Sequence, residues 1–381
     1  MQTEKLLLIP GPSPVHPRII NSLSLPTVSH VSPEFTTEFK KALRNLKKTV
    51  FTEKGEPFIV SGAGTLAMEM ALVNTLSSGE KLLVVSQGYF GARMNAIAGC
   101  FGVNCDFLES PWGEAVRPEK VAVKLDSGNY QAAVFTHVDT CTGACAPIKG
   151  YADVLKGREI LFILDGVCAT GGIEERMDRW GIDVLLTAAQ KCYGAPPGLS
   201  ILVVSERAME KRRSMKSIPA YYADLLRWLL VMRDPSKYFS TPCVNEIRAF
   251  YEATEIMIEE GMENRFARHE QFARAFRAAL RELGFSFFTE EAYLADTLTV
   301  VNYMSGIMDT EFRRILGDNG VIVAGGLAET AGKVFRMGHM GNLSQAQVLF
   351  AVDALEKTLQ TLGYSFSSGA GRDAADKILK E

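Results

Sequence analysis

One lysine in the chain, Lys191, stands where a buried amine is expected. It follows the apolar run Val184–Ala188 and precedes a segment dense in glycine and proline, Gly194–Gly198. Lysine is rarely buried without a purpose. Desolvation lowers the pKa of the ammonium group and leaves a free amine that can attack an aldehyde carbon. Lys191 is therefore our candidate for a lysine that forms a Schiff base.

Asp165 follows a second apolar run and lies 26 residues before Lys191 (191 − 165 = 26), which is one strand–helix–strand step. An aspartate directly after a strand is usually a cap or a turn residue. It can also hold the N–H⁺ of a heterocycle, because a buried carboxylate stabilises the protonated nitrogen. Both interpretations stay open on this residue alone.

A glycine-rich segment, Ser61–Thr65, follows a third apolar run and opens a helical pattern. Free N–H groups and the helix dipole favour a phosphate there. The spacing Gly62-x-Gly64-x-x-Ala67 also fits a dinucleotide fingerprint, which needs an acidic residue closing the next strand. That strand ends Val85-Ser86-Gln87, without a carboxylate. A tight turn without a ligand remains the alternative.

Two further segments follow strands and could contact a flat ring. Ser86–Gly91 places Tyr89 and Phe90 between glycines, where an aromatic side chain could stack on a ring. Thr136–Gly143 is dense in short polar side chains that can form hydrogen bonds. Core packing and an ordinary polar loop are the competing explanations for these two segments.

The order of elements predicts an α/β fold with a mostly parallel sheet. Short apolar runs alternate with segments of helical period, such as Thr65–Leu76, and this pattern is typical of βαβ units covered on both faces. The predicted strands are Phe58–Ser61, Lys81–Ser86, Ala132–Thr136, Leu161–Leu164, Val184–Ala188 and Ser200–Val204. Ligands of such sheets bind at the carboxyl ends of the strands. The candidate residues should therefore meet at one edge.

We expect three parts in the chain. Residues 1–16 form an extended arm, 17–258 a large domain and 259–381 a smaller α+β domain. The smaller domain is expected to hold a long helix at Glu259–Leu283, strands Thr297–Tyr303 and Val334–Met337, and helices Thr310–Leu316 and Ser344–Leu362. The tail after Phe366 is expected to be a loose end.

Composition favours a small-molecule partner. The 381 residues carry 41 Lys+Arg against 44 Asp+Glu, a net charge of −3, which leaves no electrostatic footprint for nucleic acid or an anionic membrane. Seven scattered cysteines predict neither a disulfide framework nor, at Cys141 and Cys145, a metal site. No run approaches the roughly 18 apolar residues of a membrane span. We expect a soluble, cytoplasmic protein.

A phosphate loop, a ring-stacking residue, an acid for a ring nitrogen and a Schiff-base lysine together are the set that pyridoxal 5′-phosphate (PLP) requires. The chain resembles the class V, fold-type I PLP-dependent aminotransferases, most closely the alanine–glyoxylate/serine–pyruvate group. The resemblance runs from Leu7 to about Leu362. It is carried by PGPSPVHPRI, SGAGTLAMEMALVN, GYFGAR, LDGVCATGG, MDRWGIDVLLTAAQK, APPGLS and GKVFRMGHMG.

The resemblance implies how the cofactor ring is held. Lys191 matches the lysine that binds the cofactor aldehyde and moves the α-proton. Asp165 matches the carboxylate on the pyridine nitrogen, and Val167 the residue packed on one face of the ring. Phe90 falls where the family usually has a tryptophan or another aromatic residue on the opposite face. Thr140 matches the hydroxyl residue beside the ring.

The phosphate contacts implied by the resemblance lie at Gly64, Thr65 and Gln190. Ala63 belongs to the same segment but stands where some members have serine, so one phosphate hydroxyl is missing. Tyr238 and Thr241 match groups that reach the phosphate from the neighbouring subunit. A homodimer is therefore expected, in agreement with the prevalence of two-fold pairing.

On the substrate side, Arg336 matches the arginine that binds the substrate carboxylate, and Gly11 matches a loop that lines the pocket. Arg336 accounts for one carboxylate, so the expected substrates are small: alanine or serine as donor, and glyoxylate or pyruvate as acceptor. A dicarboxylate would need a second cation. Only Arg18, Arg227 and Arg233 lie close enough in sequence to leave this point open.

Several rival functions share parts of this pattern. A lyase or epimerase on the same fold would use the same core residues. A cysteine desulfurase needs a mobile cysteine well beyond the lysine, whereas the last cysteine is Cys243, and it tends to have histidine where Phe90 stands. A nicotinamide-dependent dehydrogenase rests on the glycine spacing alone. A non-catalytic protein of the fold would be expected to lack Lys191 or Arg336.

Overall fold

The computed structural model describes residues 5–381 of the chain. Its centre is a seven-stranded sheet in the order β2-β8-β7-β6-β5-β3-β4. The strands are β2 (Glu56–Ser61), β3 (Lys81–Ser86), β4 (Asn104–Glu109), β5 (Ala132–Thr136), β6 (Leu161–Asp165), β7 (Val184–Ala188) and β8 (Leu199–Val204). β8 runs antiparallel to β2 and β7, and the other neighbours are parallel. The predicted α/β fold class is confirmed.

All six predicted strands are present, and β4 was missed. β5, β6 and β7 are buried at every position, which explains why they read as continuous apolar runs. β4 pairs only with β3 at the edge of the sheet, and most of its residues keep contact with water. It therefore contains the polar residues Asn104, Asp106 and Glu109, and its sequence does not look like a buried strand.

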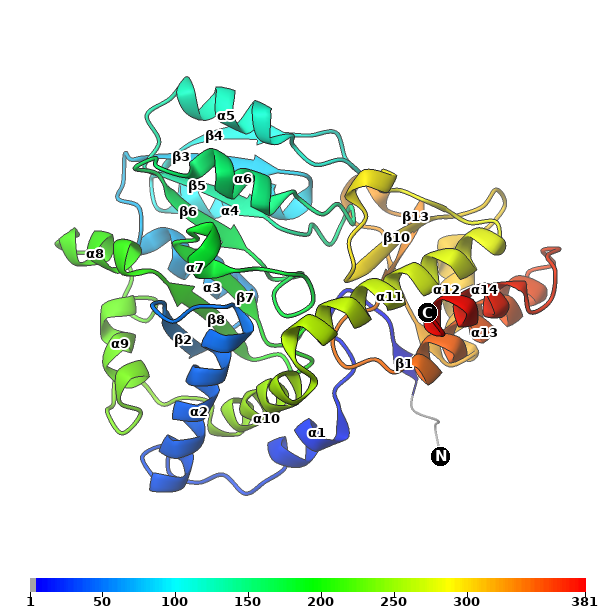
Figure 1. Cartoon of the computed structure of the whole chain (residues 1–381), viewed down its shortest axis with the longest axis horizontal. Coiled ribbons are helices and arrows are strands. Elements are labelled where there is room, and N and C mark those ends of the chain that lie inside the picture. Colours follow the sequence, from blue (N-terminus) through cyan, green and yellow to red (C-terminus); the bar gives the residue numbers. More distant parts are fainter. Residues whose placement is uncertain (1–4) are drawn as a thin grey trace.

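Helices cover both faces of this sheet (Figure 1), with α5, α6 and α7 in front of it and α3 and α4 behind. The helices between residues 17 and 233 are α1 (Pro17–Leu23), α2 (Pro33–Thr49), α3 (Gly64–Val73), α4 (Tyr89–Cys100), α5 (Pro118–Asp126), α6 (Ile148–Leu155), α7 (Met177–Trp180), α8 (Glu206–Ser214) and α9 (Leu225–Arg233). Both α3 and α4 begin directly after a strand, so their N-termini lie at the carboxyl edge of the sheet.

The long helix expected at Glu259–Leu283 is present as α11 (Met262–Glu282), and α10 (Val244–Glu260), which was not predicted, precedes it. Gly261 separates them with φ +81°, a backbone conformation that favours glycine. In Figure 1, α10 packs beside α1 and α2, whereas α11 runs on towards the C-terminal part.

The C-terminal part has a four-stranded antiparallel sheet in the order β12-β13-β10-β9. Its elements are β9 (Ser286–Phe287), β10 (Leu298–Asn302), α12 (Asp309–Asp318), β11 (Val321–Ile322), β12 (Ala324–Gly325), β13 (Val334–Gly338), α13 (Gln345–Thr361) and α14 (Ala370–Leu379). Strands and helices were thus predicted at β10, β13, α12 and α13, within a few residues of their ends.

The expectation of a loose tail after Phe366 is wrong, because α14 packs against α11 and α13. Its N-terminal N–H groups are capped by the carboxylate of Glu356, which accepts from Gly369 at 2.9 Å and from Gly371 at 3.0 Å. Ala375 and Leu379 are buried in the C-terminal core. The short polar segment before α14 concealed this amphipathic helix in the sequence.

The N-terminal arm joins the two parts. Its strand β1 (Leu6–Leu7) pairs in parallel with β11, and the chain then runs towards the large sheet before α1 begins. Leu8 lies in the C-terminal core, whereas Ile19 lies in the core of the large sheet. None of the described helices is both long and apolar enough to cross a membrane.

Candidate active site

A cavity of about 200 Å³ opens at the carboxyl edge of the large sheet. Its walls come from the N-termini of α3 and α4 and from the loops that follow β5, β6 and β7. Among the residues predicted from sequence, it brings together Ala63, Gly64, Thr65, Phe90, Thr140, Asp165, Val167, Gln190 and Lys191. Because parallel strands end at the same edge, segments more than 100 residues apart meet in this one cavity.

Lys191 is held by the N-terminal arm. Its Nζ donates a hydrogen bond to the carbonyl of Pro10, and Ser13 Oγ donates to the Lys191 carbonyl at 2.7 Å. Gly11 passes so close that a Cβ there would lie 2.5 Å from Lys191 Cδ, and its φ is +91°. Only glycine fits at position 11 without displacing the lysine. The arm thus forms part of the candidate site.

Asp165 ends β6 and is 2% exposed. Burial raises the pKa of its carboxyl group to about 7, against the opposing effects of the Val167 N–H and the Lys191 charge. No ion pair joins it to a cation among residues 5–381. A cation placed against this carboxylate would stabilise the ionised form. The carboxyl group therefore suits a protonated ring nitrogen.

The first turn of α3 suits a phosphate. Its N-cap residue Ala63 provides no side-chain cap, and the N–H groups of Gly64 and Thr65 donate to no acceptor within residues 5–381. Gln190 lines the same cavity, and the NH₂ group of its side-chain amide can donate hydrogen bonds to an anion. Unsatisfied groups at a helix N-terminus favour an anion. This end of the cavity therefore fits the phosphate of PLP.

Phe90 is the second residue of α4, and its backbone is anchored by an aspartate that the sequence analysis did not select. The Phe90 N–H donates to Asp139 Oδ2 at 2.8 Å, while Asp139 Oδ1 accepts from Cys141 at 2.8 Å and Thr142 at 3.1 Å. Asp139 is fully buried, so its carboxylate joins the start of α4 to the loop after β5. Its place in a polar loop gave no sign of this burial.

Arg336 lies on β13, is 8% exposed and borders the cavity through Thr140. Its Nη1 donates to the Thr140 carbonyl at 2.9 Å and its Nε to the Gly325 carbonyl at 2.8 Å. Burial lowers the pKa of this guanidinium, and no carboxylate pairs with it among residues 5–381. An oriented, buried cation without a counter-ion suits the carboxylate of a substrate.

The structure does not bring Tyr238 and Thr241 into the cavity of their own chain. Both lie in the exposed loop between α9 and α10, and Tyr238 is 64% exposed with its ring 5.5 Å from that of His30. Cys192, next to the lysine, is fully buried in an apolar cluster with Cys168 and Met340. That cysteine is a packing residue.

The sequence analysis missed one cation in the cavity wall. Arg93 of α4 lines the cavity, with its guanidinium 4.7 Å from the centre of the Phe90 ring. The three arginines left open from sequence are engaged elsewhere: Arg18 pairs with Glu252, Arg227 with Asp224 and Arg233 with Glu56. The signal was available in GYFGAR, because residues three apart on a helix share a face.

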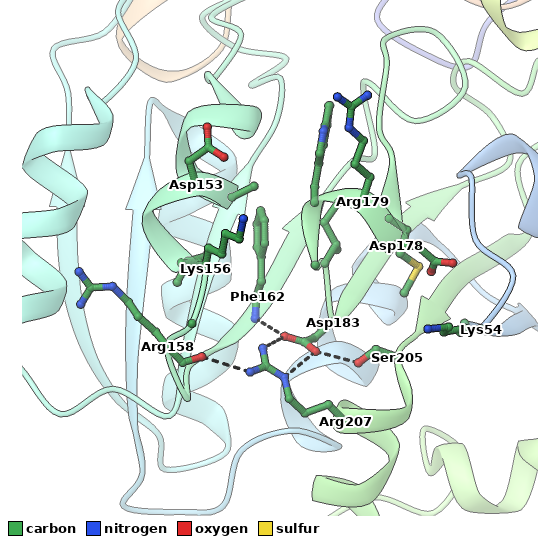
Figure 2. A pocket seen from close by; sticks show the side chains of 18 of the residues that line it. Lys54, Asp153, Lys156, Arg158, Phe162, Asp178, Arg179, Asp183, Ser205 and Arg207 are labelled. Carbon is green, nitrogen blue, oxygen red and sulfur yellow. Dashed lines mark hydrogen bonds and ion pairs between the residues drawn. The ribbon is translucent and has the colours of Figure 1, made fainter.

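A larger cleft of about 710 Å³ lies at the amino ends of the strands, on the opposite edge of the sheet. Figure 2 shows its floor, where Asp183 accepts from the Phe162 N–H, from Ser205 and from Arg207. These groups satisfy one another. Among its described lining residues, the cleft has no arrangement of nucleophile, base and unpaired buried charge like that of the smaller cavity.

Comparison with known proteins gives the family. The family model for class V aminotransferases matches residues 19–350, so this chain belongs to the class V aminotransferases and is an enzyme of that family. The L-aspartate–glyoxylate aminotransferase of Paracoccus denitrificans is 31% identical, covering 100% of this chain and 98% of the relative. The serine–glyoxylate aminotransferase of Arabidopsis thaliana is also 31% identical, covering 98% and 95%.

Solved structures agree with this assignment. The alanine–glyoxylate aminotransferase of Nostoc sp. superposes with a TM-score of 0.90 at 31% identity, covering 94% of this chain and 96% of that one. The prediction of a class V aminotransferase is therefore confirmed, as is the fold of that family. The roles of individual residues remain predictions, which the geometry above supports.

Proposed function

We propose that this aminotransferase uses PLP to move an amino group from a small amino acid, alanine or serine, to a small 2-oxo acid, glyoxylate or pyruvate. The observation that carries the proposal is one cavity in which Lys191 and Asp165 meet, with Arg336 at its border. Among residues 5–381 these three groups form no ion pair, and they suit the aldehyde, the ring nitrogen and the substrate carboxylate respectively.

PLP, when bound, supplies an electron-withdrawing ring that stabilises negative charge at the substrate Cα. Asp165 keeps the ring nitrogen protonated by opposite-charge stabilisation. The Lys191 amine holds the aldehyde carbon and, once a substrate amine displaces it, moves the proton from the substrate Cα to that carbon. Arg336 binds the α-carboxylate and so orients the Cα–H bond towards the lysine.

The proposed acceptor, glyoxylate, has more support from the relatives than the proposed donor. The three relatives described above act, by their names, with glyoxylate, but their donors are aspartate, serine and alanine. Arg336 provides for one carboxylate, which favours alanine and serine. Aspartate is the second candidate donor, favoured by the Paracoccus relative and by the presence of Arg93 in the cavity wall.

A donor panel tests this proposal. We expect kcat/KM with glyoxylate to be highest for alanine or serine, because the distal carboxylate of aspartate or glutamate would lose water without compensation. Aspartate or glutamate exceeding alanine by more than about tenfold, or 1.4 kcal/mol, would refute the small-donor proposal. Release of pyruvate without an acceptor would instead favour the lyase alternative.

A cytoplasmic homodimer is the proposed working form. Tyr238 and Thr241 are exposed in one chain, as residues that complete a neighbour's phosphate site must be. Apolar side chains are exposed in the same region, namely Leu25, Val31, Tyr221 and Tyr238. Light scattering at the enzyme concentration of the assay should give twice the chain mass. A fully active monomer would contradict this proposal.

A further inference from the structure

Arg93 is a cation in the wall of the cofactor cavity that no step above uses. It lies one turn into α4, where its guanidinium is 4.7 Å from the centre of the Phe90 ring and 5.2 Å from that of Tyr89. Among residues 5–381 it forms no ion pair and no hydrogen bond. Cation–π contacts hold the guanidinium in place while its N–H donors stay free to bind an anion.

The phosphate end of the cavity lacks a positive charge of its own. The groups that face it are the backbone N–H groups of Gly64 and Thr65, the Thr65 hydroxyl and the neutral Gln190, and Ala63 provides no hydroxyl. Among the described lining residues, the only cations are Lys191 and Arg93, and Lys191 is assigned to the aldehyde. A phosphate monoester carries nearly two negative charges at neutral pH.

The placement of Arg93 directs it to this end. Long side chains of a helix lean towards its N-terminus, so the guanidinium returns to the level of Tyr89 and Phe90, where α4 begins. The adjacent helix α3 begins at the same edge of the sheet, and its Thr65 and Met68 share the cavity wall with Arg93. Arg336, by contrast, reaches the cavity from β13 through Thr140.

We propose that Arg93 is the cation that neutralises the cofactor phosphate, and that Phe90 and Tyr89 orient it for this contact. The assignment rests on the proposed use of PLP. Phe90 then has two roles: it lines the cavity beside the cofactor ring, and its own ring holds the Arg93 guanidinium that binds the phosphate. Arg93 thereby supplies an anion contact at an end of the cavity where Ala63 provides no hydroxyl.

The test compares two ligands that differ only by the phosphate. Cofactor-free wild type, Arg93→Gln and Arg93→Lys are titrated with PLP and with pyridoxal, and dissociation constants are read from the absorbance change. Hydrogen bonds to charged groups contribute about 1.5–3 kcal/mol, so Arg93→Gln should weaken PLP about 10- to 100-fold. Pyridoxal should change less than about threefold, and Arg93→Lys should recover part of the loss.

Phe90→Leu removes the ring contact as well as the support of Arg93, so it should weaken both ligands, and PLP more than pyridoxal. Inorganic phosphate gives a second readout: it should strengthen pyridoxal binding to the wild type but not to Arg93→Gln. Equal loss of PLP and pyridoxal in Arg93→Gln, or no loss of either, would overturn the assignment. Unchanged PLP binding with a selective loss of aspartate turnover would overturn it too, and would place Arg93 at a distal substrate carboxylate.

The proposed use of PLP and the proposed role of Arg93 can be refuted by different outcomes. A wild type that binds neither PLP nor pyridoxal would refute the cofactor proposal, and the role of Arg93 with it. A wild type that binds both, with an Arg93→Gln variant that does not distinguish them, refutes the role of Arg93 alone.

Discussion

The two edges of the large sheet differ in whether their buried charged groups have partners in the chain. At the amino edge, the carboxylate of Asp183 is 3% exposed but accepts hydrogen bonds from a backbone N–H, a hydroxyl and the Arg207 guanidinium. At the carboxyl edge, Asp165 is equally buried but forms no ion pair with a cation within residues 5–381. Arg336 likewise forms no ion pair with a carboxylate in that range. The larger cleft lies at the edge whose buried charges are satisfied.

This difference separates groups that stabilise the fold from groups that await a ligand. Burying a charge is unfavourable unless a partner compensates for it. The amino edge obtains its compensation from the chain itself, and its other cations, such as Lys54 and Lys156, are exposed to water. The carboxyl edge lacks that compensation. Unpaired buried charge, more than the size of a cavity, therefore marks the candidate site.

The largest effect should come from Lys191. Lys191→Ala should lower kcat by about 10⁴-fold or more, because the variant loses both the amine that holds the aldehyde and the base that moves the proton. Steady-state rates and the visible absorbance of the purified variant provide the measurement. A variant that keeps the wild-type absorbance after added amines are removed would show that another residue binds the aldehyde.

Asp165→Asn should separate activity from stability. With cofactor, removing the partner of a buried cation costs about 3–5 kcal/mol, so kcat/KM should fall roughly 10²- to 10³-fold. The same asparagine in Asp183→Asn should leave kcat/KM within about twofold. If both variants lost activity equally, the proposed difference between the two edges would be wrong.

Without cofactor, Asp165→Asn should be the more stable protein at pH 8. The carboxyl group has a pKa of about 7 when folded and 3.8 in its ordinary state. The folded chain therefore binds more protons between about pH 4 and 7, and the stability contributed by this group falls as pH rises through that window. Thermal unfolding from pH 4 to 8 should show the fall in the wild type and not in the variant.

Arg336→Lys should have a smaller and more selective effect. Lysine keeps the charge but loses the planar pair of donors, so KM for alanine should rise about 10- to 100-fold. The PLP dissociation constant should stay within about threefold, because Arg336 does not line the cofactor cavity. Equal weakening of alanine and PLP would mean that Arg336 supports the fold or the cofactor.

Asp183→Asn should have the smallest effect on catalysis and act on stability. The variant weakens buried hydrogen bonds to the Phe162 N–H and to Ser205, each worth about 1 kcal/mol, and Arg207 becomes free to point into water. We expect Tm of the cofactor-free protein to fall by several degrees. An unchanged Tm would show that the hydrogen bonds and the ion pair of Asp183 at the amino edge do not stabilise the fold.

Much of the fold was readable from the sequence because its central strands are buried on both faces. β5, β6 and β7 are buried at every position, so their apolar runs stand out, and Asp165 ends β6 while Lys191 follows β7. β4 and α14 were missed because each is amphipathic and borders polar segments. Gly261 moves the start of the predicted long helix from Glu259 to Met262, because it separates α11 from α10.

Site residues could be predicted where the chain topology places them, and not where their position depends on contacts formed in the folded chain. Residues at strand ends could be placed, because topology brings those ends together. Asp139 could not, since its burial depends on the N–H groups of Phe90, Cys141 and Thr142 folding around it. Arg93 lies between these cases: its spacing of three residues from Phe90 places both on one face of a helix, but the lean of its side chain towards the N-terminus depends on a rotamer. Contacts that depend on rotamers cannot be read from spacing.

The arm that holds Lys191 gives the chain a particular order of completion during synthesis. Leu6 pairs with Val321, which is translated 315 residues later (321 − 6 = 315). At about 5–20 residues per second, the arm waits roughly 15–60 s for its partner strand. Until then the Pro10 carbonyl and Gly11 have no fixed position against the lysine. A nascent chain that already contains the whole large sheet should therefore still lack a finished active site.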